Sequence, residues 1–187
     1  MNSLNGGARP RLLLAAALIG SLSVASSAAW AGTATSDLTV TATVTQRCTI
    51  TTTPVAFGAY DPVVAHRTAA LPGTGQILLT CTKGSSSITV ELGDGGSFAA
   101  GFRRMSGGGD FLRYTLNQPL GPAPGTCPGT QEWRGAAPPG LYTALATWSA
   151  LTAVTFNVCG TVPAAQDVTG SSAGIPYTDT VLATVNF

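Results

Sequence analysis

Four cysteines and one histidine are the residues in this sequence whose side chains are best suited to covalent, redox or metal chemistry. They are Cys48, Cys81, Cys127, Cys159 and His66. A zinc site usually combines closely spaced cysteines or histidines, and no Cys-x-x-Cys spacing occurs here. A Ser-His-Asp hydrolase would depend on His66 as its base, and this residue lies in a proline-flanked segment that is typical of a surface loop. We therefore expect no metal, no cofactor and no catalytic residue.

Carboxylates and glycine-rich loops give two further ways to build a site. The eight acidic residues are scattered and form none of the paired motifs that glycoside hydrolysis needs. The segments GDGGS (93–97) and GGGD (107–110) could pass for phosphate or calcium loops, but neither precedes a helix or carries several spaced acids. We expect both to be hairpin turns with positive φ angles. Trp133 and Trp148 are candidates for a carbohydrate platform, but we favour a place in the core.

The first 31 residues have the pattern of a secretory signal peptide. Arg9 and Arg11 form a positive start, residues 12–20 read LLLAAALIG, and residues 29–31 read AWA, which has the small-x-small form of a cleavage site. An uncleaved membrane anchor is the alternative, but the apolar run is well short of the roughly 20 residues that span a bilayer. We expect cleavage after Ala31, export through the periplasm, and no membrane span in the chain that remains.

Export would place the four cysteines in an oxidising compartment, where disulfides form. Four cysteines allow three pairings. Their order favours Cys48 with Cys81 and Cys127 with Cys159, because each pair then closes one half of the domain. In the chain-entropy model, each such bond stabilises the fold by about 3 to 4 kcal/mol before native strain is subtracted.

The net charge of the chain argues against nucleic acid and anionic lipid as partners. Loss of the leader would remove two of the nine basic residues, so that seven would stand against eight acidic ones and the formal net charge would fall from +1 to −1. A chain without a basic field does not attract nucleic acid or anionic lipid. Charged residues are only 9% of the sequence, which suits an exported β-protein better than a cytosolic enzyme.

Residues 33–45, TATSDLTVTATVT, alternate with unusual regularity. The odd positions are all threonine apart from Asp37, and the even positions are Ala34, Ser36, Leu38, Val40, Ala42 and Val44. A period of two is typical of a β-strand with one buried face. The segment is longer than the usual strand of 5 or 6 residues, so either it is one long strand or two functional segments share one pattern.

Residues 177–187, YTDTVLATVNF, show a second alternation. One parity holds Tyr177, Val181, Ala183, Val185 and Phe187, and the other holds Thr178, Thr180, Thr184 and Asn186. Asp179 and Leu182 are the exceptions. An edge strand is normally paired, charged or covered, and nothing in the sequence after Phe187 can do this, so we expect an unfilled sheet edge here.

Between these segments, short apolar runs separated by turn residues predict further strands. We expect them near residues 55–60, 76–82, 88–92, 103–105, 111–116, 131–134, 141–146 and 151–159. Residues 141–154 also show helical spacing, but their threonines and flanking turns favour strands. Seven or eight short strands with regular turns predict an all-β sandwich in a single domain.

The order of these features resembles the spore coat protein U domain family, which includes the subunits of archaic chaperone-usher pili. The matching stretches are the alternating segment before Cys48, FGAYDP (57–62), GQILLTCTKG (75–84), ITVELGDGG (88–96), RRMSGGGDFLRYTL (103–116) and the terminal YTDTVLATVNF. They cover nearly the whole chain after the leader. Residues 118–140, around Cys127, are proline-rich and depart from the family's pattern, so the first disulfide is better supported than the second.

The resemblance implies an immunoglobulin-like β-sandwich that lacks its last strand. It implies that a periplasmic chaperone lends a strand during export, and that the N-terminal extension of another copy or a related subunit replaces it at an outer-membrane usher. Residues 32–47 would then be a donor extension running into the first strand, and residues 48–187 the sandwich domain. The side chains entering the groove would be Leu38, Val40, Ala42 and Val44. The acceptor edge would be formed by Val181, Ala183, Val185 and Phe187.

These expectations describe a secreted structural subunit that polymerises into a surface pilus, fibre or coat. The alternative is a monomeric secreted adhesin or lectin-like binding module, including one whose extension folds back into its own groove. A small secreted hydrolase is a third reading, which the lack of a base disfavours.

Overall fold

The computed structural model describes residues 31–135, 140–171 and 176–187. Residues 1–30 of the expected leader lie outside the described residues. Every element of regular secondary structure in these ranges is a β-strand, so the expected all-β fold is confirmed. The strands are β1 (Cys48–Ala56), β2 (Leu71–Cys81), β3 (Ser86–Leu92), β4 (Arg103–Gly107), β5 (Asp110–Asn117), β6 (Tyr142–Thr147), β7 (Val154–Val162) and β8 (Ala183–Asn186).

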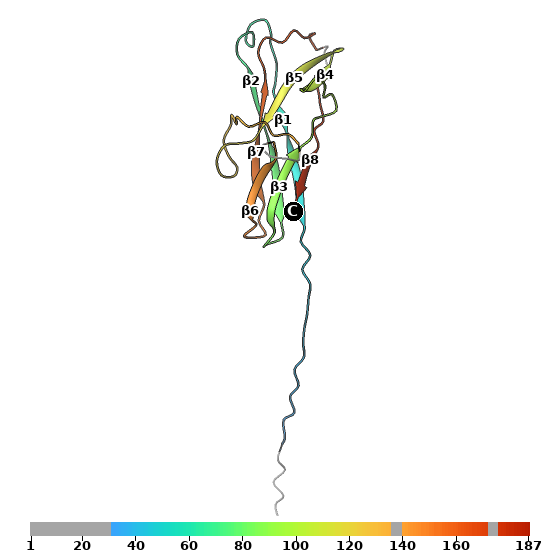
Figure 1. Ribbon diagram of the computed structural model, residues 1–187, viewed down its shortest axis with the longest axis vertical. Helices are drawn as coiled ribbons and strands as arrows, with labels where there is room; N and C mark the ends of the chain where they lie inside the picture. Colours follow the sequence, from blue (N-terminus) through green and yellow to red (C-terminus); the bar gives the residue numbers. More distant parts are fainter. Residues whose placement is uncertain (1–30, 136–139, 172–175) are drawn as a thin grey trace, which may run out of the picture. The chain divides into compact units, whose positions relative to one another are not determined.

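The strands form two antiparallel sheets that pack as an immunoglobulin-like sandwich (Figure 1). The larger sheet has five strands in the order β1-β2-β7-β5-β4, and the smaller has three in the order β6-β3-β8. In the larger sheet, β2 and β7 pair along their length, from Leu71 opposite Val162 to Leu79 opposite Val154. The sheet order leaves β1 and β4 at the edges of the larger sheet, and β6 and β8 at the edges of the smaller one.

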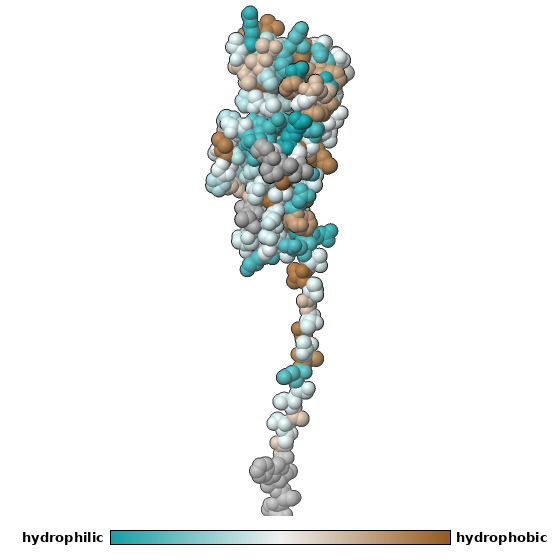
Figure 2. Space-filling view, in the orientation of Figure 1, coloured by the Kyte–Doolittle hydropathy of each residue, from teal (hydrophilic) through white to brown (hydrophobic). Residues whose placement is uncertain are grey.

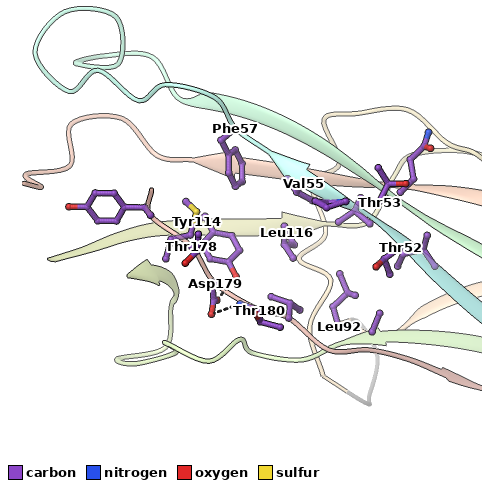
Figure 3. A pocket seen from close by; sticks show the side chains of 18 residues that line it. Thr52, Thr53, Val55, Phe57, Leu92, Tyr114, Leu116, Thr178, Asp179 and Thr180 are labelled. Atoms are coloured by element: carbon purple, nitrogen blue, oxygen red, sulfur yellow. Dashed lines mark hydrogen bonds between the residues drawn. The ribbon is translucent and has the colours of Figure 1, made fainter. Parts of the chain in front are cut away.

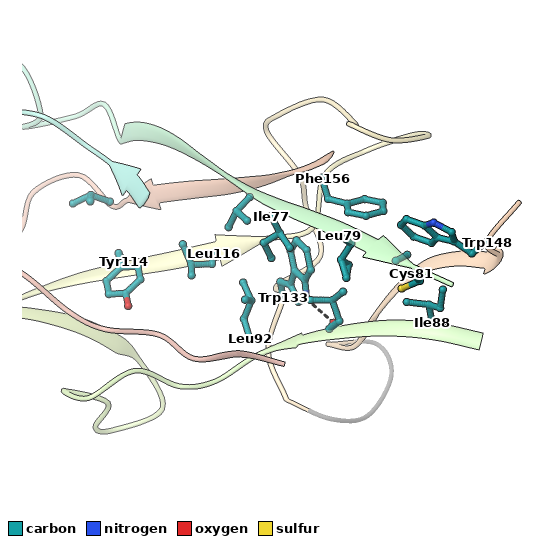
Figure 4. Packing of buried hydrophobic residues seen from close by; sticks show 14 of the residues in the cluster. Ile77, Leu79, Cys81, Ile88, Leu92, Tyr114, Leu116, Trp133, Trp148 and Phe156 are labelled. Carbon is teal, nitrogen blue, oxygen red and sulfur yellow. Dashed lines mark hydrogen bonds between the residues drawn. The ribbon is translucent and has the colours of Figure 1, made fainter. Parts of the chain in front are cut away.

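The core lies between the two sheets and is built from alternate residues of their strands (Figure 4). Ile77 and Leu79 of β2 face Ile88 and Val90 of β3, and all four are 1% exposed or less. Since successive strand residues point to opposite faces, alternate positions of each strand share this core.

Trp133 and Trp148 are fully buried in this core. The indole Nε1–H of Trp133 donates a hydrogen bond to the carbonyl oxygen of Val90 at 2.8 Å, so its polar group is satisfied inside the sandwich. The two rings are therefore core residues, as the sequence favoured, and they offer no surface for a sugar.

Two disulfides are present, and together they use all four cysteines. Cys48 at the start of β1 is bonded to Cys81 at the end of β2, opposite which it also lies in the strand ladder. Cys127 ties the proline-rich loop between β5 and β6 to Cys159 of β7. Both pairs are those that the order of the cysteines favoured.

The first strand differs from the one expected at residues 55–60. Strand β1 begins at Cys48 and ends at Ala56, so it starts before the expected range and includes Pro54. Proline lacks an N–H group and is tolerated in a sheet at edges and bulges. Both conditions hold, because β1 is an edge strand and its ladder with β2 shifts register between Thr53 and Ala56.

The last strand is shorter than the expected run from residue 177 to 187. Only Ala183–Asn186 form β8, paired with β3, while Thr178 makes an isolated bridge to Ser106 of β4. The chain thus contacts one sheet before it enters the other. A continuous strand was wrong because Asp179 turns its side chain to loop amides, as described below. The strand expected at residues 131–134 is likewise only a bridge between Glu132 and Asn117.

The two glycine-rich segments have different roles. Gly108 and Gly109 have φ angles of 59° and 84° and form the turn of the β4–β5 hairpin, as predicted. Residues 93–97 instead connect β3 of the smaller sheet to β4 of the larger one, so the expected hairpin is wrong there. This loop binds a carboxylate of the same chain, because the amides of Gly96 and Ser97 donate hydrogen bonds to Asp179.

Candidate functional site

The candidate site is a groove between β1, the edge of the larger sheet, and β8, the edge of the smaller one (Figure 3). Among the described residues, each of these strands has a paired neighbour on one side only. The groove has a volume of about 400 Å³. Its lining comes from both sheets and from the segment that leads into β8.

One wall of the groove is formed by the second half of β1 and the residue that follows it. Thr52, Thr53, Val55 and Phe57 line it. The side chains of Val55 and Phe57 pack directly against Gly160 of β7. A Cβ atom added to Gly160 would lie 2.6 Å from Cγ1 of Val55 and 2.8 Å from Cε1 of Phe57. Real Cβ atoms do not come so close to a neighbour. The missing side chain in β7 therefore lets this wall lie flat against the sheet.

The floor of the groove is apolar and continuous with the core. It is formed by Ile77, Leu92, Met105, Leu116 and Val158, which come from five different strands. Four of these residues are at most 5% exposed, and Met105 is half-buried. An apolar side chain that entered the groove would therefore contact the interior of the sandwich rather than a superficial patch.

The opposite wall is the chain from Tyr177 to Ala183, and Asp179 fixes it (Figure 3). Its Oδ1 atom accepts hydrogen bonds from the backbone N–H groups of Gly96 at 2.8 Å and Thr180 at 2.9 Å. Its Oδ2 atom accepts one from the hydroxyl of Tyr114 in β5, at 2.5 Å. This contact ties the larger sheet to the segment that leads into the smaller one, directly beside the groove.

The environment of Tyr114 keeps its hydroxyl protonated. Burial raises the pKa of Tyr114 far above its usual value of 10, and the hydrogen bond to the Asp179 carboxylate raises this pKa further. A charged phenolate would have to lose its water and face a carboxylate. The hydroxyl therefore remains a donor to Asp179 across the whole physiological pH range.

Of the four predicted acceptor residues, Val181 and Ala183 line this groove, and Val185 and Phe187 do not. Ala183 and Val185 lie in β8 opposite Leu92 and Val90 of β3. Together with Val181, which precedes the strand, they are partly buried against the core. Phe187 lies beyond the end of β8 and its side chain is 52% exposed. The sequence missed Tyr114 and Asp179, although Asp179 was one of the two exceptions to the alternation.

The predicted donor residues lie in an exposed segment that contains no strand, and hydrophobic residues recur at intervals along it (Figure 2). Residues 31–47 have no strand partner, and β1 begins only at Cys48. The side chains of Leu38, Val40 and Val44 are 88%, 85% and 80% exposed. The domain that holds the groove begins at Thr43. The alternating residues 33–45 therefore precede β1 and are not part of it.

Comparison with known proteins assigns the family. The family model of the Spore Coat Protein U domain matches residues 34–184. The chain belongs to the spore coat protein U domain family. The resemblance drawn from the sequence is thereby confirmed, and the chain is a structural protein rather than an enzyme.

Two known proteins illustrate the likeness of this spore coat protein U domain to others. Protein U of Myxococcus xanthus is 34% identical over 181 residues, which cover 88% of this chain and 90% of that protein. A solved structure, the CsuC-CsuE chaperone-tip adhesion subunit pre-assembly complex from archaic chaperone-usher Csu pili of Acinetobacter baumannii, matches with a TM-score of 0.43 and 22% identity. That match covers 78% of this chain and 40% of the other one.

His66 has a local structural role in the spore coat protein U domain. Its Nδ1 atom accepts a hydrogen bond from the backbone N–H of Asp61 at 2.9 Å, and its ring stacks on Tyr60. Asp61 in turn accepts hydrogen bonds from the amides of Val64 and Val63, which lower the pKa of its carboxyl. The histidine therefore braces a loop.

The described parts of the chain show neither a candidate metal cluster nor a membrane-spanning helix. Residues 31–135, 140–171 and 176–187 contain no cluster of three or more His, Cys, Asp or Glu side chains that could hold a metal ion. No helix within those ranges is long and apolar enough to span a membrane.

Proposed function

We propose that this protein is an exported structural subunit that polymerises by donor-strand complementation into a surface pilus, fibre or coat. One observation carries the proposal. The domain has an apolar groove between two strands that, among the described residues, each have a paired neighbour on one side only, and the same chain carries an exposed segment with alternating apolar side chains. A strand added to a sheet edge gains main-chain hydrogen bonds, and its alternate side chains fill pockets.

The dimensions of the two parts agree. From Leu38 to Val44 an extended chain covers six residue steps, or about 20 Å. The β1 wall of the groove, from Thr52 to Phe57, covers five steps, or about 17 Å if it is extended throughout. A segment of this length therefore brings three or four alternate side chains to the groove, which is the number of apolar residues that the extension offers.

The energetics favour insertion of the apolar face. Burying Leu38, Val40 or Val44 would contribute roughly 1.5 to 3 kcal/mol each, before the cost of association. The threonines at the odd positions would point outward and keep their contact with water. Because the extension and the groove are different surfaces of one subunit, the contact does not close on itself and generates a fibre.

Export requires that the groove be covered before assembly. An exposed apolar groove beside free strand edges is an aggregation hazard. In our proposal a periplasmic chaperone lends a strand to the groove after the signal peptide is removed, and an outer-membrane usher is the place where another copy or a related subunit replaces it. The finished assembly lies on the cell surface.

The test compares two charges placed one residue apart. Val40→Asp would bring a carboxylate into the groove at a cost of several kcal/mol, whereas Thr39→Asp leaves it in water. Heat-labile multimers on unboiled gels should disappear for Val40→Asp and persist for Thr39→Asp. Electron microscopy of the cell surface should show fibres or coat only for the second variant. Equal ladders for the two variants would contradict the proposal.

A further inference from the structure

The extension and the groove belong to the same chain, so the residues that join them decide whether a subunit can fill its own groove. These residues are Thr45, Gln46 and Arg47, between the last apolar residue of the extension and the first residue of β1. The structure describes all three as part of the domain that begins at Thr43.

Thr82, the residue after β2, holds this junction. Its backbone N–H donates to the carbonyl oxygen of Arg47 at 2.9 Å, and its Oγ1 atom accepts from the Arg47 N–H at 3.0 Å. The Oγ1 atom of Thr82 also lies 3.2 Å from the carbonyl oxygen of Arg47 and 3.4 Å from that of Thr45, and its hydroxyl can donate to one of them at a time. These contacts continue the ladder that pairs Cys48 with Cys81.

A subunit that filled its own groove would need a tight reversal at this junction. The extension would have to turn back and run beside β1, with residues 45–47 as the loop of a hairpin. Short hairpin loops need positive φ angles and therefore favour glycine, asparagine or aspartate. Thr45, Gln46 and Arg47 include none of these. A turn placed earlier in the chain would remove Val44, and then Ala42, from the set of inserted side chains.

We propose that Thr82 is a positioning residue that keeps the extension out of its own groove and so reserves each groove for a strand from a partner. Thr82 engages the backbone of the junction, and the turn-poor sequence at 45–47 opposes reversal. The occupant of the groove in the finished assembly is therefore the extension of a second copy or a related subunit. This inference rests on the proposed function, because it concerns the same groove.

The experiment uses the full chain with the junction altered in two ways. Thr82→Val removes the hydroxyl and keeps the shape of the side chain. Thr45→Asn with Gln46→Gly supplies the dipeptide that favours a two-residue hairpin turn. A triple variant combines these two changes with Thr82→Val. Thr80→Val, two residues back on the same strand, is the matched control, since the Thr80 hydroxyl makes none of these contacts with the junction. Melting curves verify that each variant is folded.

Two readouts follow the fate of the extension: the ratio of monomers to heat-labile multimers, and hydrogen exchange of residues 33–44 in the monomers. Thr82→Val should raise the ratio about fivefold, the effect of losing one hydrogen bond. The triple variant should be mainly monomeric, with slow exchange at residues 33–44, and Thr80→Val should match the wild type. An unchanged ladder in the triple variant, or slow exchange at residues 33–44 in wild-type monomers, would overturn the inference.

A peptide separates this inference from the proposed function. A synthetic peptide of residues 33–45 is added to full-length Val40→Asp, whose own extension cannot enter a groove. Binding of the peptide together with unchanged ladders in the junction variants would reject the role of Thr82 alone. Failure of the peptide to bind would reject donor-strand complementation, and the inference with it.

Discussion

The two edge strands of the five-stranded sheet, β1 and β4, differ in how far other parts of the chain cover them. At the β4 edge, Ser106 exchanges two backbone hydrogen bonds with Thr178, at 2.9 and 3.0 Å, so a segment of the same chain covers the strand. Nearby, the guanidinium groups of Arg104 and Arg113 stack on the rings of Phe111 and Phe102. Covering segments and charged side chains are the usual means of protecting a sheet edge.

Within the described part of the chain, the β1 edge has neither a covering segment nor a charged side chain, and its only interruptions are Pro54 and the register shift after Thr53. Thr52, Thr53 and Pro54 are exposed, and no described segment pairs with the outer side of the strand. Beside it lies the apolar floor of the groove rather than a charged surface. The contrast shows that the fold has the means to cover an edge and leaves this one free. A free edge next to an apolar groove is therefore best explained as a binding site for another strand.

The largest effect is expected from damage to the strand on the far side of the groove. Val185 of β8 is partly buried against the core and lies opposite Val90. Val185→Asp would place a carboxylate in that environment at a cost of several kcal/mol. The subunit itself should fail to fold, and its yield in the periplasm should fall to background. Folded Val185→Asp monomers in normal yield would show that β8 is not part of the cooperative fold.

The next prediction compares the two edges of the larger sheet directly. Thr53→Lys adds a charge to the free β1 edge, and Ser106→Lys adds the same charge to the covered β4 edge. A lysine on an edge opposes strand addition. Thr53→Lys should abolish the heat-labile ladder and leave the melting temperature nearly unchanged, while Ser106→Lys should assemble normally. If both variants assemble alike, the difference between the edges has no role in assembly.

A smaller effect is expected at the contact between Tyr114 and Asp179. Tyr114→Phe removes a hydrogen bond to a charged group, which contributes about 1.5 to 3 kcal/mol. The melting temperature should fall by roughly 3 to 12 °C for a domain of this size. The groove should widen or become more mobile, so hydrogen exchange should speed up at residues 178–181. A melting temperature equal to that of the wild type would mean that the contact does not stabilise the wall.

The same variant has a pH signature with a defined sign. The pKa of Tyr114 is raised in the folded state, so its contribution to stability is fully present below the usual pKa of 10 and is lost as the pH rises above it. The wild type should therefore lose stability as the pH rises beyond 10, and Tyr114→Phe should lose less over the same range. Parallel curves would assign the alkaline sensitivity to other groups.

Local sequence patterns were sufficient for much of the fold. Gly108 and Gly109 predicted the β4–β5 turn because glycine adopts successive positive φ angles without strain. The order of the cysteines predicted both disulfides. The alternation before Cys48 predicted a strand with one buried face, whereas the structure shows this segment exposed and outside any strand, so its role as a donor strand stays a prediction.

The features that the sequence did not predict depend on contacts between distant residues. Pro54 is tolerated because β1 lies at an edge with a shifted register, which no local pattern reveals. The run from Tyr177 to Phe187 divides because Asp179 binds loop amides about eighty residues away in the chain. The groove itself combines residues from seven strands, so its lining could be named only once their order was known.

The most direct test of the central claim is to cross-link the extension to a groove in an assembled fibre. A photoreactive amino acid is placed at position 40 in one preparation and at position 39 in another, and each is assembled from equal amounts of unlabelled and 15N-labelled chains. Position 40 should give cross-links to peptides that contain Leu116 or Val158, with the two isotopes mixed between the linked peptides, and position 39 should give few. Cross-links confined to one isotope, or equal yields from both positions, would contradict donor-strand complementation between subunits.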